Sequence, residues 1–270
     1  MCNDLLSIAR EMRVHIVEML AAAGSGHPGG SLSATDIIAD LYFKHMRIDP
    51  SNPGWEDRDR FVLAKGHAAP ALYAALALRG YFPVEDLQGL RKIGSHLQGH
   101  PCMSRTPGVD MSTGSLGQGL SVANGMALAG RVDGRSYYVY CLMGDGELQE
   151  GQVWEAAMSA AHYGLDHVIA FVDHNGLQID GHNDEVMTVT PIEEKFRAFG
   201  WDVVCIDGHD FDQIDDAIAH AKATKGKPTL VVCETIKGKG VSFMENQVDW
   251  HGVAPTPEQA TAAVAEIRGL

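Results

Sequence analysis

Short apolar runs recur along the chain and alternate with longer stretches of helical character. The runs, many of them rich in β-branched residues, lie at 61–64, 137–143, 167–173, 201–206 and 229–236. A first helix is expected to begin at Asn3 or Asp4, and further helical stretches fall near 33–45, 69–79, 116–130, 151–163, 191–199, 211–223 and 256–268. Strands that are apolar throughout and separated by helices are typical of a parallel sheet covered on both faces. The sequence therefore predicts one α/β domain over residues 1–270, a doubly wound parallel sheet with helices on both faces.

Composition and charge narrow the classes of function. The chain carries 35 acidic and 21 basic residues, a formal net charge of −14, so it has no overall positive field for nucleic acid or an anionic membrane. No apolar run approaches the ~18 residues of a membrane span, and the N-terminus lacks a signal-like apolar core. The five cysteines are scattered and form no CxxC pair, which argues against a disulfide framework and a structural zinc site. We expect a cytoplasmic protein that binds neither nucleic acid nor membrane.

Two of the apolar runs lead into polar residues flanked by glycine. The run 137–143 meets Gly144-Asp145-Gly146, and the run 167–173 meets His174-Asn175-Gly176. Asn175 follows Asp145 by 30 residues (175 − 145), the size of one strand–helix–strand step, so both side chains are expected at neighbouring strand ends. A carboxylate and an amide oxygen beside phosphate-accessible glycine backbone suit Mg²⁺. Each motif alone is more typical of a turn, but their spacing favours a magnesium and phosphate site.

The segment GDGELQEGQVWEAAMSAAHYGLDHVIAFVDHNGLQIDG, which starts at Gly144, resembles the thiamine diphosphate-binding motif and, more closely, transketolase. The resemblance implies the thiamine diphosphate-binding fold, with Mg²⁺ held by Asp145, Asn175 and the main-chain carbonyl of Leu177. It implies that Gly146 and Asn175 contact the diphosphate, and that Glu150 faces a partner half across the cofactor cleft. A simpler role for Glu150 is that of a helix N-terminal acid favoured by the helix dipole, and both roles are compatible.

Four of the thirteen histidines are framed by glycine: His27 in GSGHPGG, His67 in KGHAAPA, His100 in QGHPC and His251 in DWHGV. A histidine in such a setting is usually a loop residue, and these four lack the short spacing of zinc ligands. Imidazoles that bind diphosphate oxygens and sugar hydroxyls fit the pattern better. The transketolase resemblance implies that His27 and His100 contact the ketose donor, that His67 and His251 contact the diphosphate, and that His251 also reaches the substrate.

A glycine-rich segment, STGSLGQGLSVANGMALA, precedes the GDG motif. Small residues at the start of a helix explain it structurally, because they permit close packing. By the resemblance, Gly114, Ser115 and Leu116 lie against the thiamine moiety, although Gly-Ser-Leu here replaces the family's Gly-Pro-Leu. The order of residues matches neither the dinucleotide fingerprint nor a Walker-type phosphate loop, so nucleotide-binding functions are disfavoured.

The resemblance runs from SGHPGG to DWHG but matches only the first part of a full-length transketolase. In that family the cofactor lies between a diphosphate domain and a pyrimidine domain, which supplies an activating glutamate. We therefore expect residues 1–270 to be the N-terminal subunit of a two-component transketolase. The pyrimidine and C-terminal domains are expected on a partner chain, in an α2β2 heterotetramer. Such an enzyme transfers a two-carbon ketol unit from a ketose, phosphorylated or otherwise acidic, to an aldose.

Two alternatives stay open at this point. The α subunit of a 2-oxoacid dehydrogenase also carries GDG and a later Asn on a separate chain, but the histidine–glycine contexts and ELQEG disfavour it. A catalytically silent paralogue that serves only in assembly belongs to a different class. The intact set of Asp145, Asn175 and histidines disfavours it, because a silent chain has no physical need for all of them.

Overall fold

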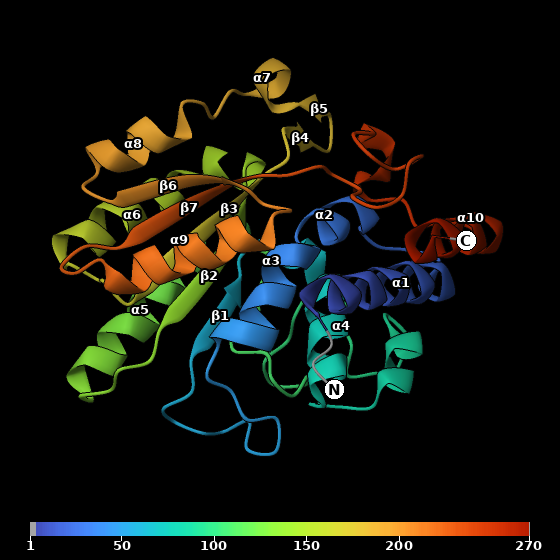
Figure 1. The fold of residues 1–270 in the computed structure, drawn as a ribbon, viewed down its shortest axis with the longest axis horizontal. Coiled ribbons are helices and arrows are strands. Elements are labelled where there is room, and N and C mark those ends of the chain that lie inside the picture. The colour runs from blue at the N-terminus through green and yellow to red at the C-terminus, as the bar shows by residue number, and fades with distance from the viewer. Residues whose placement is uncertain (1–3, 270) are drawn as a thin grey trace.

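The computed structural model describes residues 4–269. A five-stranded sheet in the order β1-β2-β3-β7-β6 forms its centre, and every neighbouring pair of strands is parallel (Figure 1). A separate hairpin of two short strands follows β3. The strands are β1 (Arg60–Leu63), β2 (Val139–Gly144), β3 (Val168–His174), β4 (Leu177–Gln178), β5 (Gly181–His182), β6 (Asp202–Asp207) and β7 (Thr229–Glu234).

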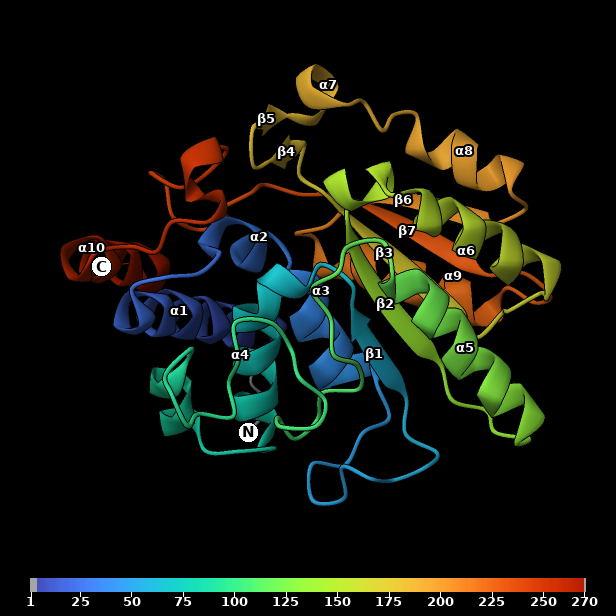
Figure 2. The same ribbon diagram turned by 180° about the vertical axis from the view of Figure 1, so that it is seen from behind.

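Helices cover both faces of the sheet. The face seen in Figure 1 carries α3, α4 and α9, with α1 outside them, and the reverse view in Figure 2 shows α5, α6 and α8. The helices are α1 (Leu5–Ala23), α2 (Pro28–Ser33), α3 (Thr35–Asp40), α4 (Ala69–Arg79), α5 (Gly119–Val132), α6 (Gly151–His162), α7 (Asn183–Val186), α8 (Ile192–Ala198), α9 (Phe211–Ala223) and α10 (Pro257–Arg268).

The apolar strands are buried on both sides because successive side chains point to opposite faces. Along β2, Tyr140 and Leu142 join the core under α1, α3, α4 and α9. Their neighbours Val139, Cys141 and Met143 join the second core under α5, α6 and α8. The predicted fold class, a doubly wound α/β sheet, is confirmed.

Most predicted elements are present, and their ends follow local chemistry. The Asp4 side chain accepts a hydrogen bond from the Ser7 amide at 2.7 Å and begins α1, as predicted; Asn3 lies outside the described residues. Gly24, with φ of 62°, ends that helix.

Among residues 4–269, no helix combines the length and apolar character that crossing a membrane requires.

The single helix expected over 33–45 is wrong in its boundaries. Pro28 begins α2 earlier, and α3 then runs into a π-helical turn, η1 (Leu41–His45). The Met46 amide closes that turn on the Leu41 carbonyl at 2.8 Å, five residues back. Apolar spacing does not distinguish an α-helix from one widened turn, so the sequence contains no sign of η1.

Candidate active site

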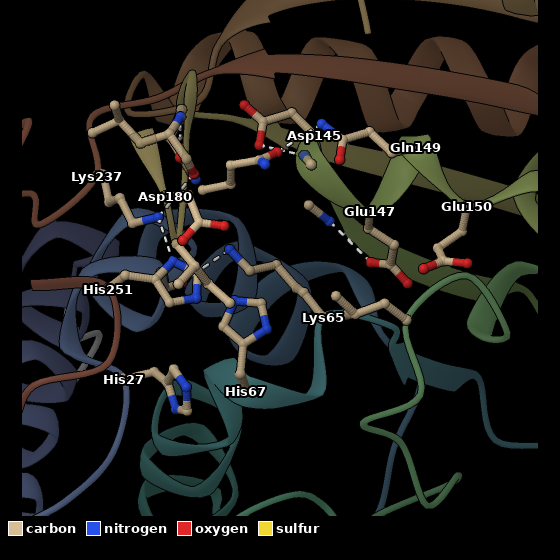
Figure 3. Close-up of a pocket in the computed structure, with 18 of the residues that line it drawn as sticks. His27, Lys65, His67, Asp145, Glu147, Gln149, Glu150, Asp180, Lys237 and His251 are labelled. Atoms are coloured by element: carbon tan, nitrogen blue, oxygen red, sulfur yellow. Dashed lines mark hydrogen bonds between the residues drawn. The ribbon is translucent and has the colours of Figure 1, made fainter. Parts of the chain in front are cut away.

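A cavity of about 330 Å³ lies at the carboxyl ends of β2 and β3 (Figure 3). Its walls come from segments far apart in the sequence, including α2, the loops after β1 and β3, and the stretch before α10. Every predicted site residue except Ser115 lines it: His27, His67, His100, Gly114, Leu116, Asp145, Gly146, Glu150, Asn175, Leu177 and His251. Ser115 is exposed beside them, so its contact with the thiamine moiety stays a prediction.

The tips of β2 and β3 are neighbours, as the 30-residue spacing predicts. Gly144 pairs with Asp173 across the two strands, which brings the next residues of each strand together. Asp145 is only 2% exposed, and its carboxylate accepts from the Gly146 amide at 2.8 Å and the Gly176 amide at 2.6 Å. Burial, with the Asp173 charge nearby, raises its pKa. A nearby cation stabilises the ionised form of such a buried carboxylate.

Asn175 is oriented by its neighbours. Its Nδ2 donates to Asp173 at 3.3 Å, while its Oδ1 accepts from the Leu177 amide at 3.2 Å. The amide is thereby assigned by its hydrogen-bond network, with the oxygen on the Leu177 side. Asp145, Asn175 and the Leu177 carbonyl thus offer three oxygen atoms of the type that Mg²⁺ binds.

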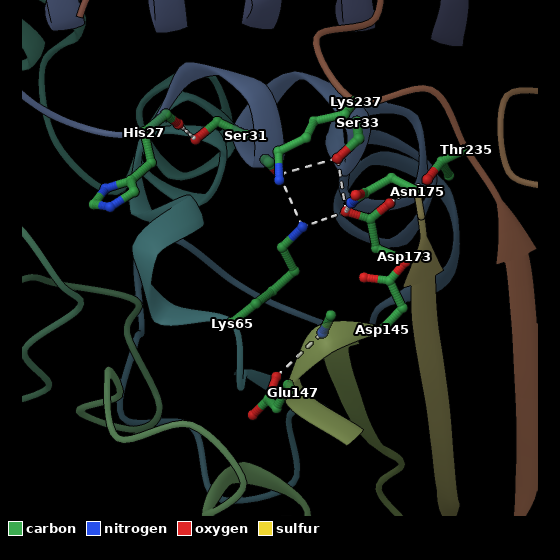
Figure 4. A network of polar contacts seen from close by, with 12 residues as sticks. His27, Ser31, Ser33, Lys65, Asp145, Glu147, Asp173, Asn175, Thr235 and Lys237 are labelled. Atoms are coloured by element: carbon green, nitrogen blue, oxygen red, sulfur yellow. Dashed lines mark hydrogen bonds and ion pairs between the residues drawn. The ribbon is translucent and has the colours of Figure 1, made fainter. Parts of the chain in front are cut away.

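Asp173 lies beneath these residues as a fully buried hub (Figure 4). It forms an ion pair with the buried Lys65 ammonium, and it accepts from the Ser33 hydroxyl at 2.6 Å and from the Thr235 hydroxyl. Burial alone raises the pKa of Asp173, but Lys65 and the hydroxyl donors outweigh it and hold the pKa below its usual value. The hub therefore fixes the ends of β1, β3 and β7 relative to α2. The motifs in the sequence do not reveal it.

Glu147 connects two parts of the site. Its Oε1 accepts from the Gly117 amide at 2.9 Å, and its Oε2 accepts from the Gly144 amide at 3.1 Å. The side chain is buried, and burial raises its pKa to about 7. One carboxylate thus ties the glycine-rich segment before α5 to the tip of β2. Sequence reasoning missed this role, although an acid directly after Gly144-Asp145-Gly146 is a usable signal.

The four glycine-framed histidines meet in one cluster. The ring centroid of His27 lies 5.4 Å from that of His67, 6.5 Å from that of His100 and 5.6 Å from that of His251. Burial is the main cause that lowers the pKa of each ring, to about 4 for His27 and about 3 for His251. All four rings are therefore neutral at pH 7, and each offers one donor and one acceptor nitrogen.

Lys237 sets the proton position on His251. Its ammonium donates to the Leu177 carbonyl at 2.8 Å and lies 2.8 Å from His251 Nδ1. Because an ammonium only donates, Nδ1 accepts and the ring proton is on Nε2. Burial, and then the nearby Lys65 charge, lowers the pKa of Lys237 to about 8. Lys237 follows β7 in the chain, and the structure places it in the wall of the cavity.

These residues fit a thiamine diphosphate and its metal ion. Asp145 is a buried anion whose hydrogen-bond donors, among the described residues, are main-chain amides. Lys237 supplies a cation near neutral pH, and His27 Nδ1 is buried without a hydrogen-bond partner within residues 4–269. At Gly30 a Cβ atom would lie 3.2 Å from His67 Nε2, so glycine keeps this wall open. The cavity therefore combines a cation site with donors for an anionic group.

Comparison with known proteins agrees with this chemistry. A family profile described as "Transketolase, thiamine diphosphate binding domain" matches residues 6–270. The chain is 52% identical over 264 residues to 6-deoxy-6-sulfo-D-fructose transketolase subunit SqwG of Clostridium sp. (strain MSTE9), covering 98% of this chain and 96% of that one. It is 43% identical to one of the subunits of the apulose-4-phosphate transketolase of Phocaeicola vulgatus, covering 94% and 90% of the two chains.

Longer relatives match in one part only. Transketolase-like protein 2 of Bos taurus is 43% identical over 98% of this chain, which spans 42% of that protein. The solved transketolase from Leishmania mexicana has a TM-score of 0.93 and 34% identity, with 98% of this chain matching 41% of that one. On the profile, the sequence identities and the shared fold, the chain belongs to the transketolase family and corresponds to its thiamine diphosphate-binding domain.

Proposed function

We propose that residues 1–270 form the diphosphate-binding subunit of a two-component transketolase that uses thiamine diphosphate and Mg²⁺. The observation that carries the proposal is the joined tips of β2 and β3, where a buried Asp145, which forms no ion pair with any described residue, lies beside Asn175 and the Leu177 carbonyl. Two relatives of similar length are named as transketolase subunits, which supports a partner chain that carries the pyrimidine and C-terminal domains.

Each group in the cavity has an assigned task. Asp145, Asn175 and the Leu177 carbonyl hold Mg²⁺, and Gly146, Asn175, His67 and His251 contact the diphosphate. Gly114, Ser115 and Leu116 support the thiamine moiety. When bound, the cofactor supplies the reactive carbon that accepts the two-carbon unit of the ketose. The protein's contribution is to anchor, orient and move protons around that carbon.

The histidine cluster handles the sugar hydroxyls. His27 and His100 are neutral at pH 7 because their pKa values are lowered, so each ring can accept a hydroxyl proton at one nitrogen. His251 reaches the same space, and Lys237 fixes its tautomer so that Nε2 donates. Bond cleavage in the ketose requires removal of a hydroxyl proton, and His27 and His100 are the nearby bases that our proposal assigns to it.

The mouth of the cavity supports docking of a partner chain. Leu116 and Ile179 line the cavity and are 37% and 68% exposed, and Glu150 is exposed beside them. Apolar side chains at the rim of a polar site are typical of a surface that another chain covers. We therefore place the pyrimidine domain over this mouth, in an α2β2 heterotetramer. The four described cysteines are free, which fits a cytoplasmic location.

The donor is expected to be a ketose with an acidic group. The names of two relatives specify a sulfonated and a phosphorylated sugar, 6-deoxy-6-sulfo-D-fructose and apulose 4-phosphate. A ketose panel should therefore compare sulfonated, phosphorylated and neutral donors. The chain is purified with the partner that co-purifies from its host, and aldose products are measured by mass spectrometry.

Ketol transfer that requires both chains, thiamine diphosphate and Mg²⁺ is the expected result, and Asp145→Ala should abolish Mg²⁺-dependent retention of the cofactor. Decarboxylation of a 2-oxoacid without ketol transfer would instead favour a dehydrogenase-type enzyme. Thermal stability of the chain that does not respond to the cofactor and Mg²⁺ would favour a catalytically silent role in assembly.

A further inference from the structure

A second group of metal-ligand side chains lies outside the cavity, where the π-helical turn η1 meets α9. Asp40 ends α3, His45 ends η1, and Asp215 projects from α9. One ligand atom from each of the three residues lies within 4.8 Å of the others. The wide turn matters here because it places Asp40 and His45, five residues apart, on one side of the helical segment.

Asp40 has unmet bonding capacity. Its side chain is fully buried, and neither carboxylate oxygen has a hydrogen-bond partner within residues 4–269. His45 Nε2 lies 3.1 Å from Asp40 Oδ1 but makes its hydrogen bond to Asp215 Oδ1, at 2.7 Å. A single N–H cannot serve both carboxylates, and an unpaired buried carboxylate is costly.

The surroundings of Asp215 fit a metal ligand. While Oδ1 faces His45, Oδ2 accepts from the Lys44 ammonium. A carboxylate that binds a metal through one oxygen commonly accepts a hydrogen bond through the other. The side chains of His45 and Asp215 are 16% and 21% exposed, so solvent reaches the group and can supply a further ligand.

We propose that Asp40, His45 and Asp215 bind a divalent transition metal ion of the Zn²⁺ type, which ties η1 to α9. His45 binds as the neutral imidazole through Nε2, and each aspartate contributes one oxygen. An imidazole with two carboxylates favours Zn²⁺ and similar ions over Mg²⁺, whose preferred ligands are oxygen atoms alone. This site is separate from the cofactor cavity and does not depend on the function proposed above.

The number of zinc ions bound by the full chain, compared between the wild type and variants, tests the site. The wild type, His45→Gln and Asp215→Asn are dialysed against Zn²⁺ with excess Mg²⁺ and thiamine diphosphate, and bound zinc is counted by mass spectrometry. The matched control is His220→Gln, since among residues 4–269 His220 pairs with a single carboxylate, that of Asp202 at 2.7 Å. Zinc bound by the histidines of the cavity contributes equally to all four chains. Circular dichroism selects the variants that fold.

His45→Gln and Asp215→Asn should each bind one zinc ion fewer than the wild type and the control. Zn²⁺ should also raise the melting temperature of the wild type and of His220→Gln more than that of either site variant. Equal zinc counts in all folded chains would overturn the proposal, as would a loss of zinc in the control alone.

If neither site variant folds, Lys44→Met decides, because the Lys44 side chain is 47% exposed and its replacement leaves all three ligands in place. Loss of the hydrogen bond that orients the Asp215 carboxylate should weaken zinc binding about 10–100-fold in a competition titration with a chelator. A zinc affinity equal to or tighter than that of the wild type would overturn the proposal.

Discussion

Two pairs of neighbouring strands end at the same edge of the sheet, and they differ in how their acids are satisfied. At the tips of β2 and β3, Asp145 and Asp173 are buried at 2% and 0% exposure. At the tips of β6 and β7, Asp207 and Glu234 are paired across the strands but exposed. Asp207 accepts from the His209 amide at 2.8 Å, and Glu234 contacts His174 at 2.7 Å.

The difference between the two pairs shows which property distinguishes a candidate site from an ordinary end of a strand. Parallel strands place polar residues at their carboxyl ends in both pairs, yet of the two only β2 and β3 hold an anion away from water without a full counter-charge. At β6 and β7, the His209 amide, the His174 ring and solvent already satisfy the acids. Position on the sheet is therefore insufficient, and burial that leaves bonding capacity unmet distinguishes the candidate site.

The largest expected loss of stability comes from removing the Asp173 carboxylate, the buried hub beneath the site. Asp173→Asn should lower the free energy of unfolding by about 3–5 kcal/mol, because it leaves the buried Lys65 ammonium without its partner. Urea unfolding measures the change. Glu234→Gln is the control at the other strand pair and should change stability by about 0.5 kcal/mol or less. Equal losses in the two variants would contradict a special role for the buried Asp173–Lys65 pair.

Asp145→Asn tests the difference between the two strand pairs through cofactor affinity. Loss of residues that only orient metal ligands costs about 10–100-fold in affinity, so loss of a ligand should weaken Mg²⁺-dependent cofactor binding by about 100-fold or more. Titration calorimetry with thiamine diphosphate measures it. Asp207→Asn, the matched change at β6, should leave the affinity within about twofold. An unchanged affinity in Asp145→Asn would remove Asp145 from the site.

Lys237 should make cofactor binding in the cavity depend on pH. Its pKa of about 8 means that the ammonium is present below this pH and lost above it. Affinity for the diphosphate should therefore fall as the pH rises through about 8. Lys237→Met should bind about tenfold more weakly at pH 7 and lose this dependence, since a charged hydrogen bond contributes about 1.5–3 kcal/mol. Lys239→Met, beside the β6 and β7 tips, should behave as the wild type.

Glu147 should make the stability of the cofactor-free chain depend on pH. Its pKa is about 7 in the folded chain against 4.5 as the reference, so the folded state binds more protons between these values. Stability therefore falls as the pH rises from about 4.5 to 7, by a slope that Glu147→Gln should remove. Gln149→Ala, in the same turn, should keep it. Unfolding at several pH values measures the slope, and an unaltered slope in Glu147→Gln would contradict the assignment.

The strands and the neighbouring positions of Asp145 and Asn175 could be predicted from the sequence because their signals are local. Apolar runs marked the strands, and one crossover of 30 residues placed Asn175 beside Asp145. The supporting groups could not be found in this way. Lys65 reaches Asp173 across 108 residues of sequence, and Glu147 meets Gly117 across 30, so only the folded chain shows these pairings. The histidine cluster was predicted by family resemblance, whereas its shared burial required the structure.

The location of the metal ion decides whether Asp145 is a metal ligand. Crystals of the chain with thiamine diphosphate and Mn²⁺ in place of Mg²⁺ would locate the ion by anomalous scattering. We expect a peak bonded to the Asp145 carboxylate, Asn175 Oδ1 and the Leu177 carbonyl, with the diphosphate completing its coordination. Bound cofactor with the ion elsewhere, or with Asp145 outside its coordination shell, would contradict the proposed metal site.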